Sequence, residues 1–219
     1  EKLIVILDMG SKIQQCINPD EYDNIKSVVN DYLKEGIAHT LDETRNLSDS
    51  GQFEDISLQQ GIRQILYPYE EMEVLNPEWE VILKDIIDSL FEQMSDEEYN
   101  ILNEEFGTYM VSRAYEYRQL LEYLVFRYFA KSIYDYDFLG KCQMLVTNFF
   151  VIRQMDIIRW LDNHREYSFK DRMDVVHIFS RQVEYSEDNI ENLYEDFIFD
   201  DIFKTDSLIA ILWIDSENI

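Results

Sequence analysis

The sequence predicts an all-α fold, and three observations support that prediction. Apolar residues recur at three- and four-residue intervals along most of the chain, which is the spacing of one helix face. Capping residues followed by acidic first turns mark several helix starts. Alternating apolar and polar stretches bounded by turn residues, which are typical of strands, are scarce. We therefore expect a multi-helix bundle with a long central pair of aromatic-rich helices and acidic outer helices.

The first two helices are predicted from apolar spacing and from turn residues. One helix spans about residues 2–17 and begins with a run of apolar side chains. In the next segment, Asn18 stands before Pro19, an arrangement that predicts an N-cap and a first helical residue. Apolar residues then follow at helical spacing as far as Gly36, which we expect to end that helix.

The middle of the chain contains one weak stretch and two strong helix starts. Residues 40–56 carry acidic and small residues that break any apolar stripe, so we expect a loop or a mobile linker there. Asn76 before Pro77 repeats the N-cap arrangement and precedes a further amphipathic helix. Ser95, with Glu98 three residues later, forms the sequence pattern of a capping box.

The second half contains the longest predicted helices. Residues 114–134 and 137–161 are rich in apolar and aromatic residues, and we expect them to form the central pair. Ser168 and Ser186 each begin a further helix, since acidic residues follow both of them within one turn. We expect residues 1–219 to form a single helical domain, and the apolar start without an initiator Met suggests a C-terminal fragment of a longer protein.

Charge excludes some classes of function and is distributed unevenly. The chain carries 19 Lys and Arg against 45 Asp and Glu, a formal net charge of −26. Such a chain repels phosphate backbones and anionic lipid surfaces, so we expect neither nucleic-acid nor membrane binding. Residues 108–183 nevertheless hold 11 basic against 9 acidic residues, so the acidic excess lies outside this region. Two widely separated cysteines predict two buried thiols in a reducing cytoplasm.

Motifs for cofactors and metals are missing from the sequence. The six glycines never lie closer than ten residues to one another, which excludes a glycine-rich nucleotide loop of the Rossmann or P-loop kind. Asp174 and His177 lie one helical turn apart, but a helical di-iron site needs a second acid–histidine pair, which the chain does not supply. We therefore predict no metal site in this chain.

One polar stripe is a candidate site. Asp174, His177, Arg181 and Glu184 follow one another at intervals of three, four and three residues, and so share one face of a predicted helix. The stripe is either a row of structural ion pairs against a neighbouring helix or the polar wall of a cleft that positions or deprotonates an amine. We expect the core face of the same helix to carry Met173, Val176, Phe179 and Val183.

The aromatic segment from Glu122 to Asp137 supports two interpretations. Its apolar residues at helical spacing are either core positions or the lining of a groove, and the core is the more common outcome. These residues are Leu124, Phe126, Tyr128, Phe129 and Ile133. At the end of the segment, Tyr134 and Asp135 form a candidate binding lip.

Three segments together resemble the C-terminal half of the flagellin lysine-N-methylases. They are the opening helix EKLIVILDMGSKIQQ, the segment EYLVFRYFAKSIYDYDFLGKCQMLVTNFFVIRQMDIIRWLDN (Glu122–Asn163) and the segment SRQVEYSEDNIENLY (Ser180–Tyr194). The resemblance implies a bacterial protein that methylates surface lysines of flagellin with S-adenosylmethionine as donor. Proteins of that family carry a cysteine cluster near the N-terminus, which this chain lacks, and the chain departs from the family pattern at Tyr136 and Tyr185.

We therefore expect a helical C-terminal domain that docks flagellin, or another lysine-rich protein, or that forms one wall of the active site. His177, Arg181, Glu184 and Asn189 are the candidate substrate-positioning residues. Whether the isolated chain is itself a lysine N-methyltransferase is open at this point, as is the position of the cofactor. Two alternatives are a non-catalytic acidic helical module that binds a basic partner protein and an acidic mimic of DNA.

Overall fold

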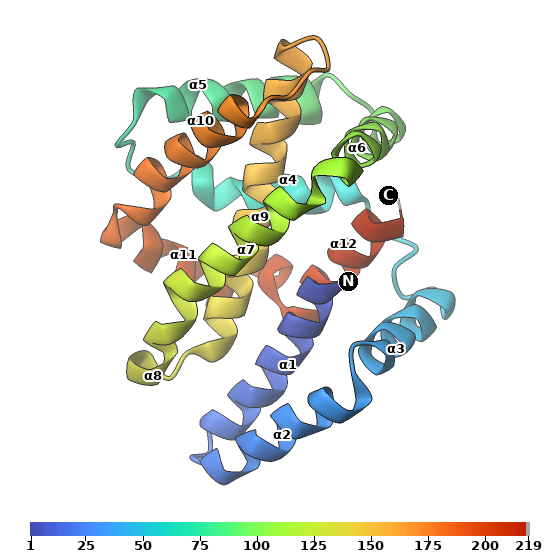
Figure 1. Cartoon of the computed structure of the whole chain (residues 1–219), viewed down its shortest axis with the longest axis vertical. Coiled ribbons are helices and arrows are strands. Elements are labelled where there is room, and N and C mark those ends of the chain that lie inside the picture. Colours follow the sequence, from blue (N-terminus) through green and yellow to red (C-terminus); the bar gives the residue numbers. More distant parts are fainter. Residues whose placement is uncertain (218–219) are drawn as a thin grey trace.

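The structure, a computed structural model, describes residues 1–217, and in this part of the chain every regular element is a helix (Figure 1). The predicted all-α fold is confirmed. Short 3₁₀ or π turns connect or extend several helices, at Ile87–Glu92, Val111–Arg113, Phe129–Lys131, Ser180–Glu184 and Asp201–Phe203. The α-helices are α1 (Lys2–Ile17), α2 (Tyr22–Glu35), α3 (Ala38–Asp49), α4 (Leu58–Glu70), α5 (Pro77–Ile86), α6 (Asp96–Met110), α7 (Ala114–Tyr128), α8 (Ser132–Asp135), α9 (Phe138–Asp162), α10 (Phe169–Phe179), α11 (Glu187–Phe199) and α12 (Thr205–Glu217).

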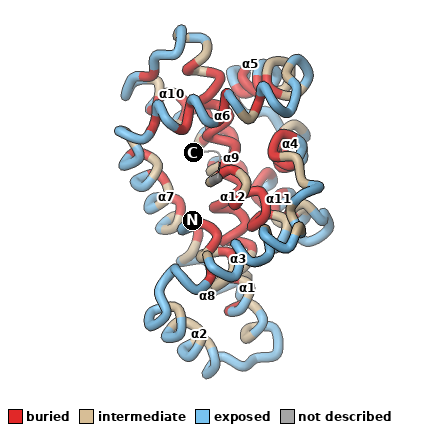
Figure 2. Tube along the Cα trace, turned by 90° about the vertical axis from the view of Figure 1, so that its right-hand side faces the viewer, coloured by how far each residue is buried: buried red, intermediate tan, exposed pale blue. Residues whose placement is uncertain are grey.

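The helix α9 runs through the middle of the bundle and is buried on almost every side (Figure 2). It packs against α1, α4, α5, α7, α10, α11 and α12. Two of its buried amide oxygens accept hydrogen bonds from tyrosines of neighbouring helices: the Tyr69 hydroxyl donates to Asn148 Oδ1 at 2.8 Å, and the Tyr99 hydroxyl donates to Gln154 Oε1 at 2.9 Å. These bonds help to fix the positions of α4 and α6 on α9, because a buried amide oxygen that loses its donor raises the free energy of the folded state.

The second helix of the expected central pair, α7, takes a different position. It ends at Tyr128, and a 3₁₀ turn separates it from the short α8. Leu124 and Tyr128 face the core, whereas Phe126 is 87% exposed and Ile133 is 73% exposed, so the prediction that these two are core residues is wrong. The α7 helix therefore lies on the outside of α9, with one aromatic face open to solvent.

The region that we expected to be a loop or linker, residues 40–56, contains a helix. α3 covers Ala38–Asp49, so the prediction is wrong for residues 40–49. The buried positions of this helix are Thr40 and Thr44, and the Thr44 hydroxyl donates to the Thr40 carbonyl at 2.8 Å. Because threonines take the inner face, the apolar periodicity that reveals a helix is missing there.

Most of the predicted helix starts are confirmed. Ser95 and Ser168 both form complete capping boxes, and the Asn76 side chain accepts a hydrogen bond from the Glu78 amide at the start of α5. Asn18 is an exception, because α2 begins only at Tyr22. Asp20 takes a left-handed backbone conformation with a φ of 61°, which lets the chain turn between α1 and α2.

The face that α10 buries agrees with the prediction only in part: Phe179 and Val183 are buried as predicted, whereas Val176 is half-buried. Arg172, Val175, Ile178 and Phe179 are buried, whereas Met173 is 51% exposed. The Arg172 guanidinium donates to the Asp156 carboxylate of α9 and to Glu116 Oε2 of α7, the latter at 3.3 Å. The inner face of α10 is therefore partly ionic, and α10 is anchored to α7 and α9 by buried charges.

Candidate functional site

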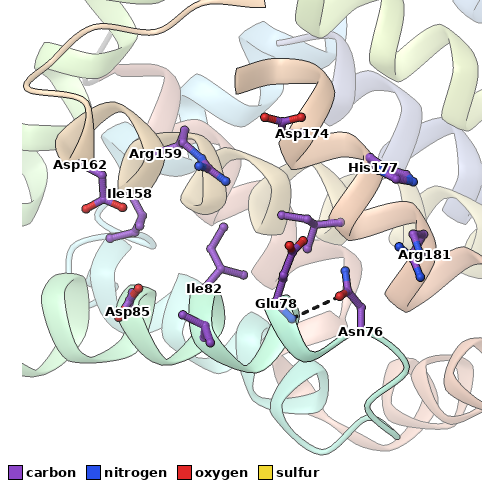
Figure 3. Close-up of a pocket in the computed structure, with 12 residues that line it drawn as sticks. Asn76, Glu78, Ile82, Asp85, Ile158, Arg159, Asp162, Asp174, His177 and Arg181 are labelled. Carbon is purple, nitrogen blue, oxygen red and sulfur yellow. Dashed lines mark hydrogen bonds between the residues drawn. The ribbon is translucent and has the colours of Figure 1, made fainter. Parts of the chain in front are cut away.

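A cleft of about 610 Å³ lies between α5, α10 and the C-terminal end of α9 (Figure 3). Its size is in the range of ordinary ligand sites. Buried isoleucines form its apolar part, one from each of the three helices: Ile82, Ile158 and Ile178. The polar lining is Asn76, Glu78, Asp85, Arg159, Asp162, Asp174, His177 and Arg181.

Helix periodicity explains how two helices build most of the cleft. α5 contributes the residues at positions 78, 81, 82 and 85, and α10 with the π turn that follows it contributes those at positions 174, 177, 178 and 181. Both sets follow the i, i+3, i+4, i+7 pattern of one helix face. The two helices thus face each other across the cleft, and the last turn of α9 closes one end with Arg159 and Asp162 (Figure 3).

The charged groups of the cleft lack partners of their own. Four carboxylates and two guanidinium groups line it, and among residues 1–217 none of the six forms an ion pair within 4 Å or a side-chain hydrogen bond. Elsewhere on the domain, several acids are paired with a lysine or arginine one helical turn away, as Asp42 is with Arg45 and Glu122 with Arg118. The cleft therefore keeps its charges available for a ligand, with an excess of two negative charges when His177 is neutral.

Asn76 adds a hydrogen-bond donor to the wall. The residue is only 5% exposed, and its Oδ1 atom accepts the hydrogen bond that caps α5. Its Nδ2 atom has no hydrogen-bond partner in the described part of the chain, and it points into the cleft on the side of His177 and Arg181 (Figure 3). An unsatisfied buried donor costs about 1–3 kcal/mol, which an acceptor on a ligand would recover.

Two of the four predicted positioning residues line the cleft. His177 and Arg181 do so, together with Asp174 from the same stripe. Glu184 does not, because Ser180–Glu184 forms a π turn whose wider winding takes Glu184 off the stripe. It is 7% exposed and contacts α7, where its carboxylate accepts from the Tyr123 hydroxyl at 3.1 Å.

Asn189 acts on the cleft only through the backbone of a neighbouring segment. It is fully buried, and its side-chain amide both accepts from the Glu73 amide at 3.0 Å and donates to the Glu73 carbonyl at 3.1 Å. Gln182, which sequence analysis did not identify, holds the same segment by accepting from the Leu75 and Asn76 amides at 2.9 and 3.2 Å. Together these two amides hold the segment that positions Asn76 at the cleft.

The chain matches a protein family over nearly its whole length. Residues 1–211 match the family described as the FliB lysine N-methylase C-terminal domain. The chain belongs to this family. No curated protein and no solved structure matches the chain. The resemblance found in the aromatic and acidic segments is therefore confirmed at the level of the family, and the cleft is a feature of a FliB C-terminal domain.

The candidate binding lip lies far from the cleft of this domain. Tyr134 and Asp135 belong to α8, which precedes the N-terminal end of α9, whereas the cleft is at the C-terminal end of α9 (Figure 1). Tyr134 is 85% exposed, and Asp135 pairs with Lys141 at 2.7 Å. The structure thus places the lip and the cleft at opposite ends of a 25-residue helix.

A buried ionic cluster joins α7, α9 and α10 and thereby anchors α10, the helix that forms one wall of the cleft. The Asp156 carboxylate is fully buried and accepts from the Tyr117 hydroxyl at 2.6 Å as well as from Arg172. Burial raises the pKa of Asp156, and the Arg172 guanidinium opposes that rise. The sequence offered no signal for this cluster, because its members come from three helices and follow no local motif.

The described residues offer no cluster for a metal ion and no helix that could cross a membrane. Within residues 1–217, no group of three or more His, Cys, Asp or Glu side chains is arranged to hold a metal ion. No described helix combines the length and the apolar character that crossing a membrane requires.

Proposed function

We propose that this domain docks flagellin and that the cleft between α5 and α10 receives the side chain of the target lysine. The observation that carries the proposal is the set of four carboxylates around the cleft, none of which has a cationic partner within the described chain. A lysine supplies the ammonium group that these carboxylates lack. Its methylene stem also fits an apolar floor of isoleucines, because lysines bury their stems while the charged end stays in a polar environment.

The charge of the whole domain supports the same function. A net charge of −26 attracts lysine-rich surfaces at long range and raises the rate of encounter. Long-range attraction does not select one lysine among many. Selection requires a site where the ammonium is enclosed, and the cleft offers carboxylates from all three surrounding helices.

The methyl donor of the family is expected to be S-adenosylmethionine. Its adenine ring needs a stacking surface or a closely approaching backbone loop. The cleft lining contains no aromatic side chain among the described residues, and no glycine-rich loop lies beside it. The cleft does not fit this cofactor, so we assign the cleft to the substrate side of the reaction and derive no chemical step from it.

The proposal is tested by measuring the affinity of monomeric flagellin for the 219-residue chain by isothermal titration calorimetry. Replacing two cleft acids together, Asp85→Asn and Asp162→Asn, should weaken binding about tenfold, because each lost charge contact contributes up to about 1 kcal/mol. The matched control is Glu97→Gln with Glu104→Gln, two exposed acids of α6 outside the cleft. It makes the same change in net charge and should alter the affinity less than twofold.

The same experiment separates the alternative functions. An acidic interaction module that binds a basic partner through its general surface would lose affinity equally in both double variants. An acidic mimic of DNA would bind a nucleic-acid-binding protein and show no affinity for flagellin. A loss confined to the cleft variant supports lysine docking, and equal losses contradict it.

A further inference from the structure

The two ends of the cleft differ in chemistry. Asp85 and Asp162 lie at one end, whereas Asn76, His177 and Arg181 lie at the other (Figure 3). The first end carries these two carboxylates together with the Arg159 guanidinium, so negative charge exceeds positive charge there by one. The second end carries an arginine without an ion-pair partner and the unpartnered Nδ2 donor of Asn76, both of which require an acceptor. A lysine side chain satisfies the first end and leaves the second one empty.

The length of α5 measures the distance between these ends. Asn76 caps the helix and Asp85 lies nine positions further along it, which corresponds to about 13 Å at a rise of 1.5 Å per residue. An extended peptide covers about 3.3–3.6 Å per residue. The cleft therefore accommodates about four residues of extended chain, enough for two neighbouring side chains of one segment to reach the two ends.

We propose that the cleft recognises a lysine that has an aspartate or glutamate within about three residues of it in the same segment. The ammonium binds at Asp85 and Asp162, and the acidic side chain binds at Arg181 and Asn76 Nδ2. This inference rests on the proposed function, and it adds a requirement on the sequence around the lysine. Arginine and a side-chain amide are suitable donors for a carboxylate, since arginine offers several donors in a fixed geometry.

The test compares two fluorescein-labelled ten-residue Gly/Ser peptides by fluorescence anisotropy with the 219-residue chain. In the first peptide the Asp stands three residues after the Lys, and in the second it stands eight residues after it. Their compositions and net charges are identical, so the −26 charge of the domain affects both equally. We expect the first peptide to bind at least fivefold more tightly. A third peptide, with Asn in place of the near Asp, should bind more weakly than the first, although the bulk charge of the domain favours it.

Three variants test which residues produce the preference for the peptide with the near Asp. Arg181→Gln should reduce the affinity ratio of the two Lys–Asp peptides to about one. Asn76→Asp keeps a side-chain oxygen for capping α5 and removes the donor, so it should lower the ratio. Because the position is only 5% exposed, the new carboxylate should also lower the melting temperature, and the ratio is measured at a temperature where circular dichroism shows the variant folded. Lys170→Gln, on α10 and outside the cleft lining, makes the same charge change as Arg181→Gln and should preserve the ratio.

The outcomes distinguish this inference from the proposed function. Equal affinities for the two Lys–Asp peptides, with both of them bound, overturn the acidic-neighbour requirement and leave lysine docking intact. A preserved ratio in Arg181→Gln also overturns it, because the acidic side chain must then bind elsewhere. Absence of binding by either peptide overturns both proposals.

Discussion

The Glu184 carboxylate accepts a hydrogen bond from the Tyr123 hydroxyl at 3.1 Å, and this contact turns it toward α7 and away from the cleft. Glu184 also approaches Arg127, whose Nε lies 3.9 Å from its Oε1 atom, and it is almost completely buried. The residue therefore ties the end of α10 to α7. Its neighbour on the predicted stripe, Arg181, is exposed and lines the cleft.

Replacing Glu184 should affect stability rather than binding. In the wild type the Tyr123 and Tyr128 hydroxyls both donate to the Glu184 carboxylate. In Glu184→Gln the side-chain NH2 group is itself a donor, so it faces these hydroxyls with the wrong hydrogen-bonding character. We expect a loss of about 1–3 kcal/mol, measured by urea unfolding, with flagellin affinity unchanged within twofold. Glu191→Gln, at an exposed position in the interior of α11, is the control and should alter neither quantity. A weakened affinity with normal stability would instead mean that Glu184 takes part in binding.

The apolar pattern predicts that Met173 is buried and that its neighbour Arg172 is exposed. The structure reverses these positions, so substitution of Arg172 should cost more stability than substitution of Met173. Arg172→Leu leaves the buried Asp156 and Glu116 carboxylates without their shared cation, which should cost about 3–5 kcal/mol. Met173→Gln changes a half-exposed position and should cost less than about 0.5 kcal/mol. Far-UV circular dichroism during urea unfolding measures both. Similar losses in the two variants would mean that α10 does not bury the face described above.

Gly10 allows α1 to approach α9 closely. A Cβ atom at this position would lie 2.5 Å from Cys142 Sγ, so Gly10→Ala requires the two helices to move apart. We expect it to lower the unfolding free energy by about 1–3 kcal/mol. Cys142→Ala removes the sulfur atom, and the double variant should therefore lose less than the sum of the two single variants. Strict additivity in thermal unfolding would show that the two residues do not interact.

The buried Cys142 thiol should make stability depend on pH in the alkaline range. Burial raises the pKa of Cys142 to about 12, whereas the pKa of a thiol in an unfolded chain is about 8.5. The folded state thus holds its proton where the unfolded state loses it, so stability is retained below about pH 8.5 and declines toward pH 12. Between these values the unfolding free energy of the wild type should fall with pH more steeply than that of Cys142→Ala. Parallel curves would contradict the assignment.

The sequence allowed the helices to be predicted where local residues determine them. The capping boxes at Ser95 and Ser168 and the buried run of α9 depend on neighbouring residues, and all three appear in the structure. α3 was missed because Thr40 and Thr44 replace apolar residues on its inner face. Local pattern also failed on α10, where partners from α7 and α9 let Arg172 occupy a core position.

The site was predicted only in part, again because some of its contacts come from residues that are distant in the sequence. His177 and Arg181 follow α-helical spacing and line the cleft as a pair, but the π turn that removes Glu184 from the stripe has no signature in the sequence. Asn76 was identified only as a helix cap. Its second role as a donor in the wall depends on Gln182 and Asn189, which lie more than 100 positions away and hold its backbone in place.

Carbodiimide cross-linking of flagellin to this chain, followed by peptide mass spectrometry, tests lysine docking most directly. The reagent joins a carboxylate to an amine only where the two are in contact, and it thereby reports which of the 45 acidic residues meet a flagellin lysine. Docking in the cleft predicts cross-links concentrated on Asp85 and Asp162, with Glu78 and Asp174 next. Cross-links spread over the exposed acids of α2, α6 and α11, with the cleft residues unmodified, would contradict it.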